Sequence, residues 1–116
     1  YATRRLAASP FVKRHLTAYN PGMPIQSFRH KALQRLFTDG DARGLPAGQV
    51  EKLLDVLATL DTAEEPRDVG LFPGWRLHRL KGRLAGFWSV TITGNWRVVF
   101  RFDKGDAWDV DFIDYH

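Results

Sequence analysis

The spacing of apolar residues along the chain changes once, from a helical period in the first half to a strand period in the second. The stripe that predicts the first helix, over residues 30–37, consists of Ala32, Leu33, Leu36 and Phe37. A second stripe follows the i, i+3, i+4, i+7 pattern and consists of Val50, Leu53, Leu54, Leu57 and Leu60. It predicts a longer helix over residues 47–62, opened by Pro46.

From Trp75 onward the period is two, which is typical of strands with one buried face. Four strands are predicted, over residues 75–80, 87–93, 96–102 and 107–113, with tight turns at residues 94–95 and 104–105. A short strand over residues 24–28 precedes the helices. The predicted fold class is therefore α+β: a short N-terminal strand, two helices, and a four-stranded antiparallel meander packed against the helices.

The third of these strands decides which side chains the sheet exposes. Along residues 96–102, large apolar side chains alternate with Arg97, Val99 and Arg101. If the apolar set faces the helices, both arginines must project from the opposite face, because a slip of one residue would bury them. We therefore expect the outer face of the sheet, the face away from the helices, to be positively charged.

Composition limits the classes of function. The chain has 116 residues and a mass of 13.3 kDa, enough for one small domain, and its 44% hydrophobic and 26% charged residues are typical of a globular protein. It has no cysteine, which excludes disulfides, thiolate nucleophiles and cysteine-ligated metals. No apolar run approaches the roughly 20 residues of a membrane helix, so we expect a cytoplasmic protein. The histidines lack metal-site spacing and no glycine-rich phosphate loop is present, so neither a metal nor a cofactor is expected.

Positive charge is concentrated in two segments, although the net charge is only +4. Residues 1–22 hold four basic residues and no acid, and we expect a poorly ordered or partly helical extension to a domain spanning residues 23–116. Residues 76–101 hold six basic residues and no acid; these are Arg76, Arg79, Lys81, Arg83, Arg97 and Arg101. A focused basic strip can bind a polyanion, although most charged segments are ordinary solvated surface.

A set of titratable side chains in and after the predicted sheet suits metal-free cleavage of RNA. Such cleavage needs a base for the ribose 2′-hydroxyl, cations for the charge that grows on the phosphate, and an acid for the departing 5′ oxygen. The side chains that can supply these groups are His78, Lys81, Arg97, Asp114, Tyr115 and His116. Each also has a structural explanation, such as a turn lysine, a frayed C-terminus, or pairing of Arg97 with Asp109 or Asp111, so the residues alone leave the function open.

Several unusual strings in residues 23–116 give a stronger indication. In order along the chain they are IQSFRHKALQRLF, RGLPA, LHRLKG, GFWSV, NWRVVFRF and GDAWDVDFIDYH. By these strings the chain resembles the HigB-like toxins of bacterial toxin–antitoxin systems, also called the plasmid maintenance system killer family, within the RelE/ParE superfamily. The resemblance implies a RelE-like fold, with helices packed on a twisted antiparallel sheet, which agrees with the fold predicted above.

The resemblance also implies an activity, that of a ribosome-dependent endoribonuclease that cuts messenger RNA in the decoding site and arrests translation. The family uses a His and a Lys of its LHxLKG motif, the Arg of NWR, and a closing Asp–Tyr–His, which match His78, Lys81, Arg97, Asp114, Tyr115 and His116. Lys81 and Arg97 are expected to stabilise phosphate charge. Tyr115 or His78 would accept the proton, with His116 or Asp114 assisting.

Further contacts and partners follow from the same resemblance. The basic residues expected to contact RNA are Arg76, Arg79, Arg83 and Arg101. The implied partners are a helix-turn-helix antitoxin of the HigA type and the ribosome with its messenger RNA, while DNA would be bound only through the antitoxin.

The sequence departs from the family pattern at two places, and two other functions stay open. The family begins at the position of Met23, so residues 1–22 are an addition, and Arg79 stands where members often have proline. A gyrase-binding toxin of the ParE type would share the fold without needing Lys81, Arg97, Tyr115 and His116. A catalytically inactive domain retained as an antitoxin-binding co-repressor would not need the intact C-terminal motif.

Overall fold

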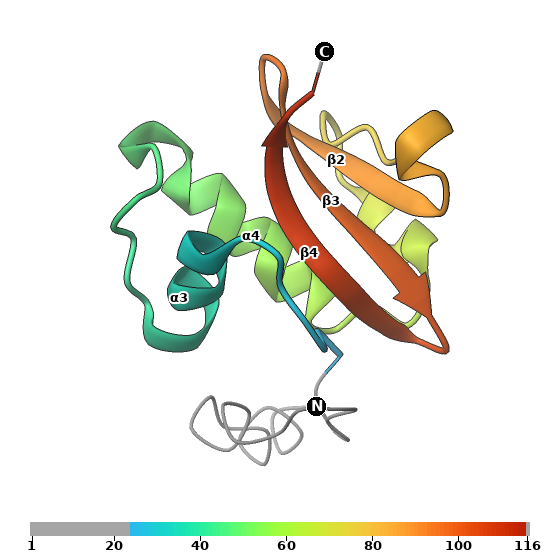
Figure 1. Cartoon of the computed structure of the whole chain (residues 1–116), viewed down its shortest axis with the longest axis horizontal. Helices are drawn as coiled ribbons and strands as arrows, with labels where there is room; N and C mark the ends of the chain where they lie inside the picture. Colours follow the sequence, from blue (N-terminus) through green and yellow to red (C-terminus); the bar gives the residue numbers. More distant parts are fainter. Residues whose placement is uncertain (1–23, 116) are drawn as a thin grey trace.

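Four antiparallel strands, arranged in sequence order, form the sheet at the centre of the fold (Figure 1). The computed structural model describes residues 24–115, in which the strands are β1 (His78–Arg79), β2 (Phe87–Thr93), β3 (Trp96–Asp103) and β4 (Asp106–Asp114). This confirms the predicted four-stranded meander. The predictions made for residues 1–22 and for His116 lie outside the described residues.

Two α-helices lie together against one face of the sheet (Figure 1). The helical elements of the described residues are α3 (Lys31–Asp39), α4 (Val50–Leu60) and three short 3₁₀ helices, η1 (Ala47–Gln49), η2 (Pro66–Leu71) and η3 (Gly82–Leu84). The second predicted helix is thus correct in position but shorter, because its first turn is the 3₁₀ helix η1. Within residues 24–115, no helix is both long enough and apolar enough to cross a lipid bilayer.

Local sequence explains where α3 begins and ends. The Nδ1 atom of His30 accepts a hydrogen bond of 3.1 Å from the N–H of Leu33, one of the N–H groups that a helix start leaves without a backbone partner. Gly40 follows the helix in the left-handed conformation, with φ of 70°, and its N–H bonds back to Leu36. The helix therefore has a defined length, which sets how much of the sheet it covers.

The core lies between the helices and the inner face of the sheet, as the alternation predicted. Val98 and Phe100 of β3 are fully buried, and they pack in one cluster with Leu53, Val56, Leu57 and Leu60 of α4. Leu54, which the predicted stripe included, is exposed instead, and Val56 takes a place in the core. Trp96 and Phe102, at the ends of the same strand, are partly buried against that cluster. Arg97 and Arg101 consequently belong to the outer face.

The first strand of the predicted meander, over residues 75–80, is reduced to the two residues of β1. Arg76 has a positive φ of 51°, which is incompatible with an extended strand. Trp75 is turned into the core, and its carbonyl accepts a hydrogen bond of 2.7 Å from the N–H of Thr91. The chain therefore bonds to the edge of β2 at Trp75, kinks at Arg76, and joins the sheet as a regular strand only at His78 and Arg79.

The outer face is not uniformly positive, which corrects the expectation drawn from alternation. Its centre is a small apolar cluster of Leu80, Phe87 and Val99, against which Leu84 and Ile113 pack. We call this group of residues the outer apolar cluster. Positive charge on the outer face is therefore divided between the two sides of the outer apolar cluster.

The segment before α3 lies beside β4 (Figure 1). Ile25 and Phe28 form isolated parallel bridges with Ala107 and Val110. These bridges fall within the short strand predicted over residues 24–28, but the structure assigns no continuous strand there, so that strand stays a prediction.

Two leucines of α4 test this account of the core. Leu57 is 1% exposed and Leu54 is 43% exposed. We expect Leu57→Ala to lower the free energy of unfolding by about 2–5 kcal/mol, because it leaves a cavity between helix and sheet. Leu54→Ala, made in the same helix, should cost less than about 1 kcal/mol. Urea denaturation followed by circular dichroism measures both, and equal losses would contradict the assigned orientation of α4.

Candidate functional site

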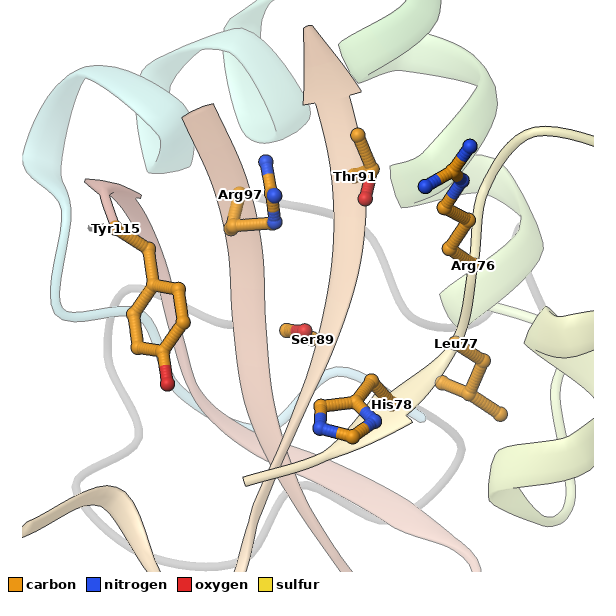
Figure 2. A pocket seen from close by; sticks show the side chains of 7 residues that line it. All are labelled: Arg76, Leu77, His78, Ser89, Thr91, Arg97 and Tyr115. Carbon is orange, nitrogen blue, oxygen red and sulfur yellow. The ribbon is translucent and has the colours of Figure 1, made fainter. Parts of the chain in front are cut away.

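A pocket of about 300 Å³ opens on the outer face of the sheet, and seven side chains line it (Figure 2). They are Arg76, Leu77, His78, Ser89, Thr91, Arg97 and Tyr115. Four of these residues were candidates from the sequence. The pocket thus brings together side chains that are up to 39 positions apart in the chain, from Arg76 to Tyr115.

The register of the sheet explains why these residues meet. His78 of β1 pairs with Ser89 of β2, and Thr91 of β2 pairs with Arg97 of β3. Tyr115 directly follows β4, and its N–H donates a hydrogen bond of 2.7 Å to the carbonyl of Asn95 in the β2–β3 turn. The pocket therefore runs across all four strands, near the end of the sheet where β4 finishes.

Arg97 is held in the pocket by hydrogen bonds to the main chain. Its Nη1 atom donates to the carbonyl oxygens of Gly94 at 2.7 Å and Trp96 at 3.1 Å. The expected alternative, an ion pair with Asp109 or Asp111, is not formed: Asp109 binds Arg101 instead. Within residues 24–115, Arg97 has no carboxylate partner, so its positive charge is available to an anionic ligand.

His78 and Tyr115 enter the pocket from opposite sides (Figure 2). The imidazole comes from β1 and the phenol from the residue after β4, with Ser89 of β2 between them; Thr91 lies farther along β2, between Arg97 and Arg76. Both rings are exposed. Their ionisable groups are consequently reachable by a ligand that occupies the space between them.

Two of the other proposed catalytic residues, Lys81 and Asp114, do not line this pocket. Lys81 is exposed on the loop just before η3. Asp114 ends β4 opposite Trp96, and strand alternation directs its side chain to the other face from Tyr115. The catalytic roles expected of Lys81 and Asp114 therefore stay predictions. A bound substrate would have to extend beyond the pocket to contact either side chain.

The residues proposed to contact RNA are also separated. Arg76 lines the pocket, whereas the guanidinium of Arg79 lies 5.3 Å from the ring centre of Trp88, on the opposite side of β1 from His78. Arg83 is exposed on η3. Arg101 belongs to the outer face and is paired with Asp109 at 2.8 Å.

Sequence reasoning missed the hydroxyl-bearing residues of the pocket. Ser89 and Thr91 occupy the positions of β2 that alternate with Trp88, Val90 and Ile92. That alternation already placed them on the outer face beside Arg97. The signal was therefore present, although small polar residues on a strand are common and carry no chemistry by themselves.

The pocket is suited to an anionic group. Two guanidinium groups, an imidazole, a phenol and two hydroxyls surround it, and guanidinium groups bind phosphate through several N–H donors at once. Within the part of the chain that the structure describes, no three His, Asp or Glu side chains cluster as metal ligands would. The arrangement is that of a small α+β protein with a cationic pocket on the outer face of its sheet.

Comparison of the sequence with known proteins shows which family the chain belongs to. Residues 26–116 match the family of HigB-like toxins, described as the RelE-like toxin of the type II toxin–antitoxin system HigB. The chain belongs to that family. A toxin of a type II system is one half of a pair, so an antitoxin partner is implied.

Two relatives cover most of the chain. It is 42% identical over 92 residues to the endoribonuclease HigB of Proteus vulgaris, and the aligned region covers 79% of this chain and 99% of the relative. It is 29% identical over 90 residues to toxin HigB-1 of Vibrio cholerae serotype O1, and here the aligned region covers 77% of this chain and 94% of the relative.

The anchoring of Arg97 predicts a modest structural effect of its removal. Arg97→Ala should lower the free energy of unfolding by about 0.5–1.5 kcal/mol, because it loses hydrogen bonds to the β2–β3 turn but no buried apolar contact. Its circular dichroism spectrum should match that of the parent protein. An unfolded variant would show instead that Arg97 is mainly a structural residue.

Proposed function

We propose that the chain is an endoribonuclease that cleaves messenger RNA on the ribosome, without a metal, by attack of a ribose 2′-hydroxyl on the adjacent phosphate. The observation that carries the proposal is the presence of His78, Arg97 and Tyr115 in one pocket on the outer face of the sheet. Membership of the HigB-like toxins and the name of the Proteus vulgaris relative, an endoribonuclease, support it.

The cations of the pocket would stabilise the phosphate. As the 2′-oxygen attacks, negative charge grows on the two non-bridging oxygens of the phosphorus. Arg97 is fixed by its main-chain hydrogen bonds, so it needs little reorganisation to meet that charge. Arg76 is the second cation of the pocket, while Lys81 would contribute from the neighbouring loop.

Two proton transfers complete the reaction. One group takes the proton of the 2′-hydroxyl as the new P–O bond forms, and another gives a proton to the 5′ oxygen as the old P–O bond breaks. His78 and Tyr115 are the two groups of the pocket that can exchange protons, with His116 or Asp114 assisting. The products are a 2′,3′-cyclic phosphate and a free 5′-hydroxyl.

The proposed partners of the chain follow from its family and from the proposed cleavage. The antitoxin would be of the HigA helix-turn-helix type and would bring the toxin to DNA, whereas the ribosome would present the message in the cytoplasm. The basic residues Arg79, Arg83 and Arg101 would contact RNA around the pocket. A gyrase-binding toxin or an inactive co-repressor would have the same fold, so the alternatives are separated by activity.

Removal of the fixed cation should abolish most cleavage. We expect Arg97→Ala to lower the rate of messenger cleavage by at least ~10²-fold, the usual effect of losing one preorganised charge-stabilising group. Mapping of messenger 5′ ends after induction in bacteria measures it. Arg67→Ala, which removes an arginine paired with Glu65 on η2, is the matched control and should cleave normally.

The same induction tests the alternatives. Cuts in translated messages that vanish in Tyr115→Phe and Lys81→Ala agree with the proposal. Intact messages together with inhibited DNA supercoiling would instead identify a gyrase-binding toxin.

A sulfur leaving group separates the two proton transfers. A message in which sulfur replaces the 5′ bridging oxygen of the scissile bond needs no acid, because a thiolate leaves without protonation. We expect this substrate to restore cleavage by one of the variants His78→Ala and Tyr115→Phe, and not by the other. The rescued variant lacks the acid, and the other lacks the base. Rescue of both, or of neither, would contradict the division of roles between these residues.

A further inference from the structure

A second cationic cluster lies on the outer face, on the other side of the outer apolar cluster from the pocket. Arg29 and Arg101 both approach the same oxygen of Asp109: Nε of Arg101 lies 2.8 Å from Oδ2, and Nη2 of Arg29 lies 3.9 Å from it. Two guanidinium groups share one carboxylate, so the three side chains carry a net charge of +1.

A bulge in β4 directs Asp109 to this place. The register between β3 and β4 shifts between Val99 and Arg101, and Asp109 has a positive φ of 54°. Its N–H donates a hydrogen bond of 2.8 Å to Oγ of Ser27 in the segment beside β4. β-Bulges often re-aim a side chain near a functional site, and this one turns a carboxylate toward two arginines.

Arg29 is also fixed in position. Its N–H donates to the carbonyl of Val110 at 2.8 Å, and its guanidinium lies 5.0 Å from the ring centre of Phe87, a cation–π contact. Phe87 also pairs with Arg101 across β2 and β3, so the two arginines border the outer apolar cluster at this ring.

The cluster is open to solvent. The side chain of Arg29 is 52% exposed and that of Arg101 is 42% exposed. Arg101 uses only Nε for its carboxylate, and its terminal amino groups have no hydrogen-bond acceptor within residues 24–115. Ion pairs this exposed contribute little to stability. Stability therefore does not explain why two arginines are held at one carboxylate.

The distance to the pocket matches an extended ligand. Arg97 and Arg101 lie on the same face of β3, four residues apart, which corresponds to about 13 Å along a strand. The outer apolar cluster lies between them. Cations at both ends with an apolar surface between them are what a single RNA strand requires, since its phosphates are charged and its bases have apolar faces.

We infer that Arg29 and Arg101 form a second phosphate-binding site, which holds an RNA phosphate outside the cleaved bond while Asp109 keeps both guanidinium groups in place. The inference rests on the proposed function, since it assigns the flanking contact of the same RNA. The phosphate belongs either to the message itself or to ribosomal RNA beside it.

The experiment measures binding, so that cleavage is not needed as a readout. A short messenger RNA, 2′-O-methylated at every ribose, is bound by the purified chain either free or on programmed ribosomes, over a range of salt concentrations. In Arg29→Gln/Arg101→Gln, affinity should fall about tenfold for each arginine that contacts phosphate. The slope of log K against log salt should shrink by ~0.7 per lost contact on single-stranded RNA.

The matched control removes two arginines elsewhere. Arg43→Gln/Arg67→Gln makes the same change in net charge at residues paired with Asp41 and Glu65; Arg43 is paired firmly enough to lower the pKa of Asp41 to about 2. This control should keep the affinity and the salt slope of the parent. Arg101→Lys, which retains the charge, should recover the salt slope, and thermal unfolding checks that all variants are folded.

Each outcome assigns or overturns the site. A loss in both arms identifies a message phosphate, and a loss only on the ribosome identifies ribosomal RNA. Equal behaviour of the test and control variants, with normal binding by the parent, overturns the second site alone. If the parent itself binds neither form of the message, the proposed function fails as well.

Discussion

The structure depends on the two-sided character of β3. Val98 and Phe100 are fully buried against the helices, so the residues between them can only face outward. Sliding the strand by one position would expose the centre of the core and bury two arginines, at a cost far above the stability of a domain of this size. The packing of their neighbours therefore places Arg97 and Arg101 on the outer face, and their own hydrogen bonds then fix the two guanidinium groups there.

The second constraint is that the two α-helices, α3 and α4, cover one face of the sheet. Within residues 24–115, neither α-helix packs over the outer face, so its polar and charged residues stay around the small outer apolar cluster. Antiparallel pairing then places the start of β3 beside the end of β4, so the last described residue, Tyr115, bonds to the β2–β3 turn and reaches the pocket. The candidate site is thus a product of sheet topology, with residues from β1, β2 and β3 and from the segment directly after β4.

The two arginines of the outer face differ in how their charge is compensated. Arg97 is bonded to neutral carbonyl groups, whereas Arg101 shares Asp109 with Arg29. A fully available cation suits the bond at which negative charge develops, and a partly compensated one suits a phosphate that only has to be held. If the ligand is the proposed RNA, this division of charge assigns each contact its place along the strand.

The sequence by itself determined the α+β class, the positions of α3 and α4, and which residues of β2 and β3 face the helices, because periodicity reports which residues must be buried. It also placed His78, Arg97 and Tyr115 among the candidates. Only the tertiary structure decided that these three share a pocket, and that Lys81 and Asp114 lie outside it. It also revealed the kink at Arg76 and the bulge at Asp109. Local pattern cannot show such features, because they arise where distant segments, such as Ser27 and Asp109, meet and satisfy each other's backbone groups.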